Sequence, residues 1–218
     1  CLTREQKEVV DKLTLMLEGD SFRGALLHGV TGSGKTRVYQ EVVEKALSLN
    51  KKVLILVPEI GLTPQSVARF SDFLNEPVYV LHSALSKVEK RKTWVEILLG
   101  RARVVLGTRS AILAPFDFDL VILDEEHDSS YKQQDPATRY HCRELAFHLA
   151  HKHGALVVLG SATPSVETFS YAKEGNLSYF YLSKRATDIQ MPKVHLIDMK
   201  KEASLQQTGI LLSSPLRE

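Results

Sequence analysis

Three observations predict an α/β fold for this 218-residue chain, with a mostly parallel sheet that is covered by helices on both faces. Short apolar runs rich in β-branched residues recur along the chain, and stretches with helical spacing separate them. The runs are apolar throughout rather than alternating, which is typical of strands buried on both faces. Several runs end directly in a polar, small or glycine-rich segment, where open parallel sheets bind ligands.

The predicted elements alternate between strands and helices along one large domain. The apolar pattern breaks near Lys200, so we expect this domain to span residues 1–199 and residues 200–218 to form a connection to a further part. Strands are expected at 25–29, 53–58, 78–82, 103–107, 120–124, 156–160, 179–182 and 194–198, and helices at about 4–18, 35–49, 63–74, 86–99, 141–153 and 164–174.

The composition is that of a packed globular domain. Hydrophobic residues make up 44% of the chain, and the net charge of +2 is only a weak indication of a polyanionic partner. The apolar runs are of strand length and no signal peptide opens the chain, so we expect a cytoplasmic protein with no membrane partner. The chain begins with Cys1 rather than Met, which suggests a fragment of a longer protein. Two cysteines give no disulfide framework.

The segment GVTGSGKT, residues 29–36, fits the phosphate-binding template G-x-x-x-x-G-K-[ST]. It lies between an expected strand and an expected helix, the setting in which backbone N–H groups can surround a β-phosphate. Lys35 would reach the β and γ oxygens, and Thr36 would supply a hydroxyl to Mg²⁺. The alternative is a chance glycine-rich turn. We predict that ATP and Mg²⁺ are held by Gly32, Ser33, Gly34, Lys35 and Thr36.

The segment LVILDEEH, residues 120–127, is an apolar run that ends in Asp124 and Glu125. Asp124 would hold Mg²⁺ through water, and Glu125 would orient and deprotonate an attacking water molecule. A carboxylate that activates water serves hydrolysis rather than transfer to a second substrate. We therefore predict an ATP hydrolase with Lys35, Asp124 and Glu125 as its catalytic residues. Alone, such a strand end could equally be structural.

The string DEEHDSSYKQQ, together with GVTGSGKT, VPEIGLTPQ, GTRSA and GSATP in this order, resembles the PriA family of bacterial replication-restart helicases (primosomal protein N′). These are superfamily-two motors, and the resemblance runs from residue 2 to about residue 199. It implies the first of two RecA-like helicase lobes of an ATP-dependent 3′ to 5′ DNA helicase that acts in replication restart and primosome assembly. The implied partners are single-stranded and forked DNA, single-stranded DNA-binding protein, primosome proteins and a second lobe of the same chain. The implied location is the bacterial cytoplasm, in association with the nucleoid.

The resemblance also implies roles for residues outside the phosphate-binding motif and the acidic motif. Gln6 would recognise adenine, because an amide can donate and accept at once; the alternative is a polar residue in a first helical turn capped by Thr3. Thr63 would contact the DNA backbone or cap a helix, or do both. Thr108 and Arg109 would contact the DNA backbone, although Arg109 could be an ordinary surface residue.

Two further segments are expected to connect DNA with the nucleotide. By resemblance Ser161 and Thr163, in GSATP, link the γ-phosphate site to DNA, or else form a tight turn; His127 is expected to take part in the same coupling. The loop at 128–140 would stack bases on aromatic rings and meet phosphates with cations, unless it is a solvated loop. Its residues in this role are Tyr131, Lys132, Arg139 and Tyr140.

Two residues receive other predictions. Trp94 shares a helix face with Val95, Leu98 and Leu99, so we expect it to pack in the core. Arg37 stands where relatives in the PriA family carry Glu, and we assign it no catalytic role.

The arginine that stabilises the transition state should come from the second lobe, so weak turnover is expected for the isolated chain. An RNA-dependent ATPase and a non-catalytic nucleotide-dependent binding module remain alternative functions.

Overall fold

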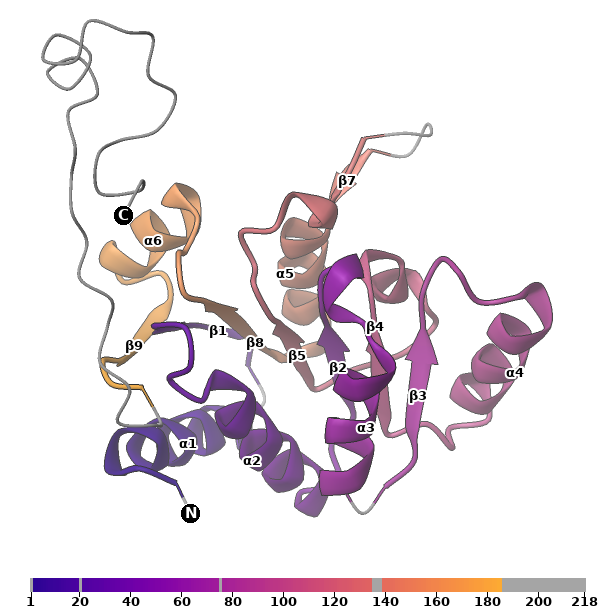
Figure 1. Ribbon diagram of the computed structural model, residues 1–218, viewed down its shortest axis with the longest axis horizontal. Helices are drawn as coiled ribbons and strands as arrows, with labels where there is room; N and C mark the ends of the chain where they lie inside the picture. Colours follow the sequence, from indigo (N-terminus) through magenta and orange to yellow (C-terminus); the bar gives the residue numbers. More distant parts are fainter. Residues whose placement is uncertain (1, 20, 75, 135–138, 186–218) are drawn as a thin grey trace, which may run out of the picture. The chain divides into compact units, whose positions relative to one another are not determined.

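The computed structural model describes residues 2–19, 21–74, 76–134 and 139–185. Within these residues, a seven-stranded sheet has the strand order β3-β4-β2-β5-β8-β1-β9, and every neighbouring pair is parallel (Figure 1). The predicted strand at 194–198 and the predicted connection at 200–218 lie outside the described residues. The strands are β1 (Arg23–Gly29), β2 (Val53–Leu56), β3 (Val78–Leu81), β4 (Val104–Gly107), β5 (Leu120–Leu123), β8 (Leu156–Ser161) and β9 (Ser178–Leu182).

In the described part of the chain, six α-helices connect or flank these strands, as the sequence predicted. Every predicted helix, and every predicted strand in the described part of the chain, is confirmed to within about two residues at each end. Three short 3₁₀ helices and a small antiparallel pair, β6 with β7, were not predicted. Among the described residues, no helix is long and apolar enough to cross a membrane. The helices are α1 (Arg4–Leu17), α2 (Lys35–Ser48), α3 (Pro64–Phe73), α4 (Lys87–Leu98), α5 (Cys142–His153) and α6 (Val166–Lys173); the shorter elements are η1 (Glu59–Gly61), η2 (Arg109–Leu113), η3 (Ser129–Tyr131), β6 (Lys132–Gln133) and β7 (Tyr140–His141).

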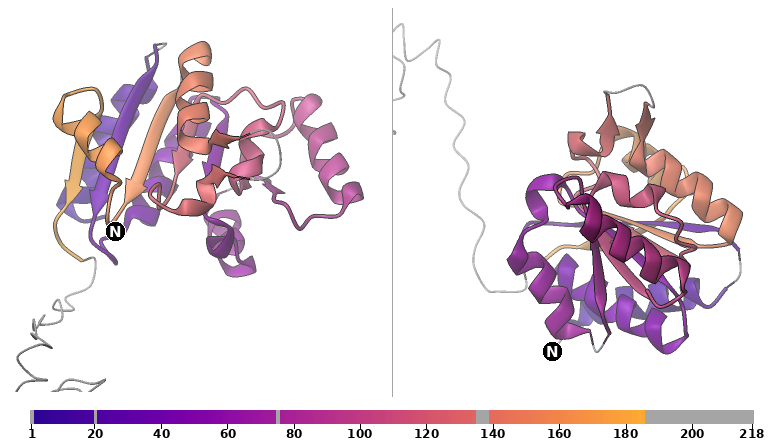
Figure 2. Two further views of the ribbon diagram at one scale, coloured as in Figure 1. Left: turned by 90° about the horizontal axis from the view of Figure 1, so that it is seen from above. Right: turned by 90° about the vertical axis from the view of Figure 1, so that its right-hand side faces the viewer.

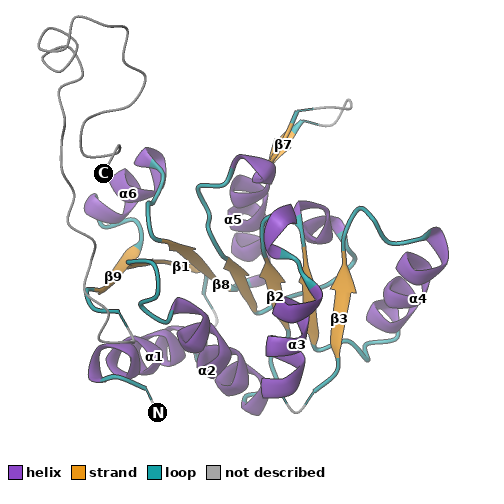
Figure 3. Ribbon diagram, viewed as in Figure 1, coloured by secondary structure: helices purple, strands orange, loops and turns teal. Residues whose placement is uncertain are grey.

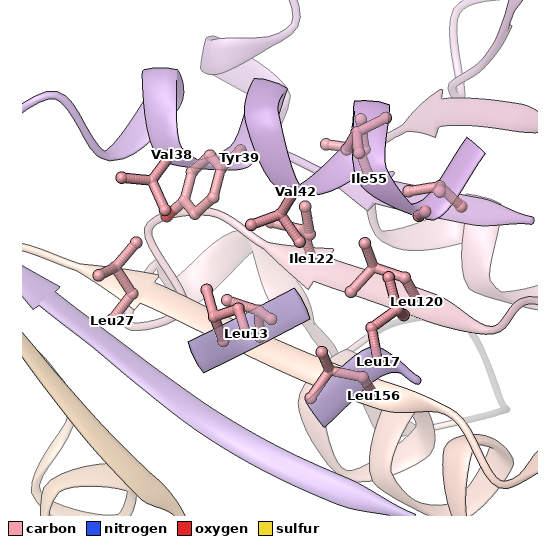
Figure 4. Packing of buried hydrophobic residues seen from close by; sticks show 14 of the residues in the cluster. Leu13, Leu17, Leu27, Val38, Tyr39, Val42, Ile55, Leu120, Ile122 and Leu156 are labelled. Atoms are coloured by element: carbon pink, nitrogen blue, oxygen red, sulfur yellow. The ribbon is translucent and has the colours of Figure 1, made fainter. Parts of the chain in front are cut away.

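The sheet separates two hydrophobic cores, and helices lie on both of its faces (Figure 2). Successive side chains of a strand point to opposite faces, so Leu27 joins the core under α1, α2 and α3, whereas Leu26 joins the core under α5 and α6. Figure 4 shows the first core, where Leu13 of α1 and Val42 of α2 pack over Ile122 of β5. This burial on both faces explains why the strands are apolar throughout.

Helix α4 lies beside the edge strand β3 (Figure 3). It buries little of its apolar surface. Ile97 is its buried residue. The prediction that Trp94 packs in the core with Val95, Leu98 and Leu99 is wrong: Trp94 is 37% exposed and Leu98 is 68% exposed. Helix α4 packs on a single edge strand, β3. Therefore only a narrow strip of its surface, around Ile97, faces the sheet.

The first core supplies a direct test of the packing. Leu13→Ala removes a side chain with no exposed surface, so we expect the free energy of unfolding to fall by about 2–5 kcal/mol. The matched control is Leu15→Ala on the same helix, where the side chain is 67% exposed and the expected loss is within about 0.5 kcal/mol. Urea unfolding followed by circular dichroism measures both. Equal losses in the two variants would contradict the described packing of α1.

Candidate active site

The phosphate-binding loop joins the end of β1 to the start of α2. Gly34 caps α2 with a φ of 84°, and Gly32 has a φ of 80°, a left-handed conformation that favours glycine at both positions. Gly29 is required for another reason, because a Cβ on it would lie 2.5 Å from the Ser33 hydroxyl oxygen. The loop therefore leaves backbone N–H groups free to face an anion at the N-terminus of α2.

Lys35 connects this loop to the acidic strand end. Its side chain is buried, and its Nζ donates to the Gly29 carbonyl at 3.1 Å and lies 3.7 Å from Oε1 of Glu125. The loop and the two acids line one cavity of about 250 Å³. The structure thus brings together the loop and the acids that the sequence predicted separately. The cavity residues are Thr31, Gly32, Ser33, Gly34, Lys35, Thr36, Asp124 and Glu125.

Asp124 follows β5 and is held by a residue that sequence reasoning missed. The Tyr39 hydroxyl donates a hydrogen bond of 2.9 Å to Oδ1 of Asp124. Burial raises the pKa of Asp124, while the hydrogen bond from Tyr39 opposes that shift. Burial and the nearby carboxylate raise the pKa of Tyr39 well above its usual value, so Tyr39 keeps its proton and acts as the donor.

Glu125 has a strained backbone at the cavity wall. Its φ is 46°, a left-handed conformation that costs a residue other than glycine about 1–3 kcal/mol. Its side chain is 39% exposed, and its Oε2 lies 3.7 Å from Nδ1 of His127. A half-exposed carboxylate beside the phosphate-binding loop can reach a water molecule and accept its proton.

The site fits a magnesium nucleotide. The Ser33 hydroxyl is a buried polar atom without a partner in the described part of the chain, and it belongs to the loop that would bind phosphate. No cluster of three or more His, Cys, Asp or Glu residues that could hold a metal occurs in the described ranges. Mg²⁺ commonly binds through one carboxylate together with nucleotide phosphates, so Asp124 and the Thr36 hydroxyl form a sufficient protein contribution.

Comparison with known proteins identifies the family. The family model for DEAD/DEAH box helicases matches residues 3–170. This chain belongs to the DEAD/DEAH box helicases. It is 45% identical to the replication restart protein PriA of Bacillus subtilis (strain 168) over 202 residues, which are 92% of this chain and 25% of that protein. It is 46% identical to the PriA of Haemophilus influenzae over 93% of this chain and 27% of the relative. The resemblance to the PriA family is confirmed, and the chain spans about a quarter of these curated relatives.

Solved helicase structures confirm the RecA-like fold. RecG bound to a three-way DNA junction superimposes with a TM-score of 0.65 at 24% identity, covering 88% of this chain and 25% of that one. The Hef helicase domain of Pyrococcus furiosus gives a TM-score of 0.58 at 23% identity, covering 82% of this chain and 37% of its own. At these identities the likeness concerns the fold.

Gln6 of this DEAD/DEAH box lobe lies against the phosphate-binding loop. It is 3% exposed, its Nε2 donates to the Ser33 carbonyl at 2.8 Å, and its Oε1 accepts from the Thr3 N–H at 2.9 Å. Thr3 caps α1, as the alternative interpretation required. Contact between Gln6 and adenine stays a prediction.

The GSATP turn is hydrogen-bonded to the acidic segment. Oγ of Ser161 lies 2.7 Å from Nδ1 of His127, and it accepts from the Thr163 N–H at 2.9 Å. The Glu126 N–H also donates to the Gly160 carbonyl at 3.0 Å. These bonds join the ends of β5 and β8 through the His127 and Ser161 side chains and the Thr163 backbone. The coupling role of His127, Ser161 and Thr163 stays a prediction.

Glu126 forms a buried ion pair that sequence reasoning missed. Its side chain has no exposed surface, and Oε2 accepts from Nη1 of Arg143 on α5 at 3.2 Å. The N-terminus of α6 completes the network, because Ser165 N–H donates to Oε1 at 2.7 Å and the Thr168 hydroxyl donates to Oε2 at 2.9 Å. Of the three acids in the DEEH string, Asp124 and Glu125 line the cavity, whereas Glu126 is structural.

Two predicted DNA contacts are corrected by the structure. Tyr131 has no exposed surface, and its hydroxyl lies 2.9 Å from the Leu56 carbonyl oxygen and 2.7 Å from that of Asp124. It therefore braces the ends of β2 and β5 and has no ring face available for a base. Thr108 is 3% exposed, and its N–H donates to the Leu81 carbonyl at 3.1 Å. A contact from its side chain to DNA is not available in this structure.

Arg109 and Thr63 have defined structural partners. Nη1 of Arg109 donates to the carbonyls of Ser130 and Lys132 at 2.6 and 3.2 Å, so it braces the loop after the acids. Thr63 caps α3 in a reciprocal pair with Ser66. Thr63 is exposed, and its contact with the DNA backbone stays a prediction, as does that of Arg109.

Three side chains of the predicted DNA-binding loop at 128–140 lie on the surface of the helicase lobe. Lys132 and Arg139 are exposed and Tyr140 is partly exposed, around the β6–β7 pair. They border an open cavity of about 500 Å³ that Gln133, Gln134 and His141 also line. Residues 135–138 of the predicted loop lie outside the described residues. The cations and one ring stay candidates for DNA contact.

Arg37, the residue that departs from the PriA pattern, lies between two helices. Its guanidinium is 2.6 Å from the Glu41 carboxylate one turn along α2 and 4.6 Å from the ring centroid of Phe73 on α3. These contacts give Arg37 a packing role.

The buried Glu126–Arg143 pair yields a stability prediction. Arg143→Ala leaves the Glu126 carboxylate buried without its cation, so the free energy of unfolding should fall by about 3–5 kcal/mol. Arg101→Ala is the matched control: it breaks an ion pair with Glu96 in which the arginine side chain is 64% exposed, and it should cost less than about 1 kcal/mol. Urea unfolding compares the two. A loss for Arg143→Ala as small as that of the control would contradict the structural role of the pair.

Proposed function

We propose that this chain is the first motor lobe of an ATP- and Mg²⁺-dependent DNA helicase that acts in replication restart. One observation carries the proposal: the phosphate-binding loop and Asp124–Glu125 line a single cavity, in a chain 45% identical to a replication restart protein PriA. The 3′ to 5′ direction and the role in primosome assembly follow from the resemblance to the PriA family.

Each residue of the cavity has a defined task in hydrolysis. Backbone N–H groups of the loop and the Lys35 ammonium bind the β- and γ-phosphates. Thr36 and Asp124 would hold Mg²⁺, which when bound would neutralise charge on the phosphates. Glu125 orients a water molecule and takes its proton as the water attacks the γ-phosphate. The bond between the γ-phosphorus and the β–γ bridging oxygen breaks, and ADP leaves. The buried donor on Asp124 and the ion pair at Lys35 keep these side chains oriented.

Movement along DNA requires the hydrolysis site to communicate with a DNA grip. The His127–Ser161 hydrogen bond connects the acidic segment with the GSATP turn, and a change at the γ-phosphate would be transmitted there. Exposed Lys132 and Arg139 contact the backbone of single-stranded or forked DNA, and Tyr140 stacks on a base. A second lobe of the same protein closes over the nucleotide and supplies the transition-state arginine.

The proposed partners and location extend beyond the described lobe. Single-stranded DNA-binding protein and primosome proteins would bind the whole protein, which would act at the nucleoid in the bacterial cytoplasm. These partners are what the resemblance to the PriA family implies.

The function is tested with Glu125→Gln in the intact protein. We expect DNA-stimulated ATP hydrolysis to fall by about 10²–10⁴-fold, because the amide cannot accept the proton of water. Binding of a fluorescent ATP analogue should persist, since Lys35 and the loop are unchanged. Steady-state hydrolysis is measured without nucleic acid and with single-stranded DNA, forked DNA or RNA.

The control for this experiment is Glu44→Gln, an exposed glutamate on α2, which should hydrolyse ATP like the wild type. Stimulation mainly by RNA would replace the DNA helicase with an RNA-dependent ATPase. Nucleotide binding without hydrolysis in the wild type would instead indicate a non-catalytic binding module.

The isolated 218-residue chain should bind nucleotide but turn it over slowly. Without a second lobe it lacks the transition-state arginine, and in GTPases the corresponding arginine contributes about 10³–10⁵-fold in kcat. We would compare kcat of the isolated chain and of the intact protein with saturating single-stranded DNA. Comparable values would show that this lobe contains every group needed for hydrolysis.

A further inference from the structure

A tyrosine of α2 reaches the carboxylate that is proposed to hold Mg²⁺. Tyr39 is 1% exposed, and its hydroxyl lies 2.9 Å from Oδ1 of Asp124. It stands three residues after Thr36, so both side chains lie on the same face of the helix. The two proposed Mg²⁺-binding residues, Thr36 and Asp124, are thus connected through one helical turn and one hydrogen bond.

This connection passes across an intervening strand. β8 lies between β1, which leads into the phosphate-binding loop, and β5, which leads into Asp124. Tyr39 passes over β8 at Gly160, where a Cβ would lie 1.6 Å from its hydroxyl oxygen and 3.4 Å from Oδ1 of Asp124. A residue with a side chain at 160 cannot coexist with the tyrosine hydroxyl in this position.

We propose that Tyr39 is a positioning residue that sets the Asp124 carboxylate at a fixed place relative to Thr36, and that Gly160 provides the space for its hydroxyl. The proposal deepens the ATP- and Mg²⁺-dependent function above and rests on it. It assigns a role to a residue of α2 beyond the phosphate-binding template, and a steric role to the glycine of GSATP.

The physical effect is preorganisation of one carboxylate. With Oδ1 engaged by Tyr39, Asp124 is restricted to one orientation, and its other oxygen remains available for the water shell of Mg²⁺. Tyr39 is itself fixed, because its ring is buried in the core with Val38, Val42 and Leu27 (Figure 4). Partners that orient metal-binding residues in this way typically change metal affinity 10–100-fold when they are removed.

Tyr39→Phe tests the hydroxyl while keeping the buried ring. In the intact protein, we would titrate Mg²⁺ into a complex with a fluorescent, non-hydrolysable ATP analogue. The Mg²⁺ concentration for half-maximal binding should rise about tenfold, while nucleotide binding in EDTA should equal that of the wild type. Tyr79→Phe is the control, because its hydroxyl lies 3.5 Å from Glu96 and away from Asp124; it should leave the Mg²⁺ dependence unchanged.

Gly160→Ala tests the space for the hydroxyl. The added methyl should displace Tyr39, weaken Mg²⁺-dependent binding at least as much as Tyr39→Phe, and lower the midpoint of thermal unfolding. In the double variant Gly160→Ala/Tyr39→Phe the closest atom becomes the ring carbon, 2.8 Å from the Cβ. The unfolding midpoint should therefore be higher in the double variant than in Gly160→Ala alone.

The outcomes separate this inference from the function on which it rests. If the wild type binds nucleotide with no dependence on Mg²⁺, both the proposed function and the inference about Tyr39 are overturned. If the wild type depends on Mg²⁺ and folded Tyr39→Phe shows the same dependence, the inference alone is overturned. A double variant less stable than Gly160→Ala would overturn the steric role of Gly160.

Discussion

The position of β8 between the two strands that carry the chemistry is the constraint on which the site depends. The phosphate-binding loop follows β1 and the acids follow β5, so the two halves of the site are separated by one strand. Backbone ladders alone would leave a gap of two strand spacings, about 10 Å, between them. Tyr39 of α2 spans this distance to reach Asp124, and Gly160 of β8 leaves room for its hydroxyl. The geometry of the cavity is therefore decided by a strand that contributes no acid or phosphate ligand.

The loop after the acids is tied to the sheet by buried polar contacts rather than left as a free surface loop. Tyr131 inserts its hydroxyl between the carbonyls of Leu56 and Asp124, and Arg109 holds the main chain on either side of it. Arg143, at the start of the helix that follows the loop, is paired with buried Glu126. A displacement of the loop would thus act on the backbone of Asp124 directly. This arrangement makes Tyr131 a connection within the lobe instead of a platform for bases.

Local patterns predicted the strands, helices and both halves of the nucleotide site, because runs, helical spacing and fixed motif spacing are short-range signals. The errors concern burial, which depends on packing between distant parts of the chain. Trp94 was expected in the core and is partly exposed, whereas Tyr131 was expected on the surface and is buried. The missed residues have the same origin. Tyr39 finds its partner 85 positions away and Arg143 finds its partner 17 positions away, on a different element in each case. Hydrophobic periodicity does not predict the Tyr39–Asp124 or Arg143–Glu126 pair, since Tyr39 and Arg143 each fit an ordinary amphipathic helix.

The strained backbone of Glu125 explains how four consecutive residues can serve four different partners. A continuing strand would send alternate side chains to the same face, which would place Asp124 and Glu126 together. The left-handed turn at Glu125 breaks this alternation, and it is followed by the Glu126 N–H bond to Gly160 and the buried Glu126 network. These contacts offset a local cost of about 1–3 kcal/mol. Asp124 meets Tyr39, Glu125 meets Lys35, Glu126 meets Arg143 and His127 meets Ser161. The strain is therefore what lets one short segment contact the nucleotide loop, two helices and the GSATP turn at once.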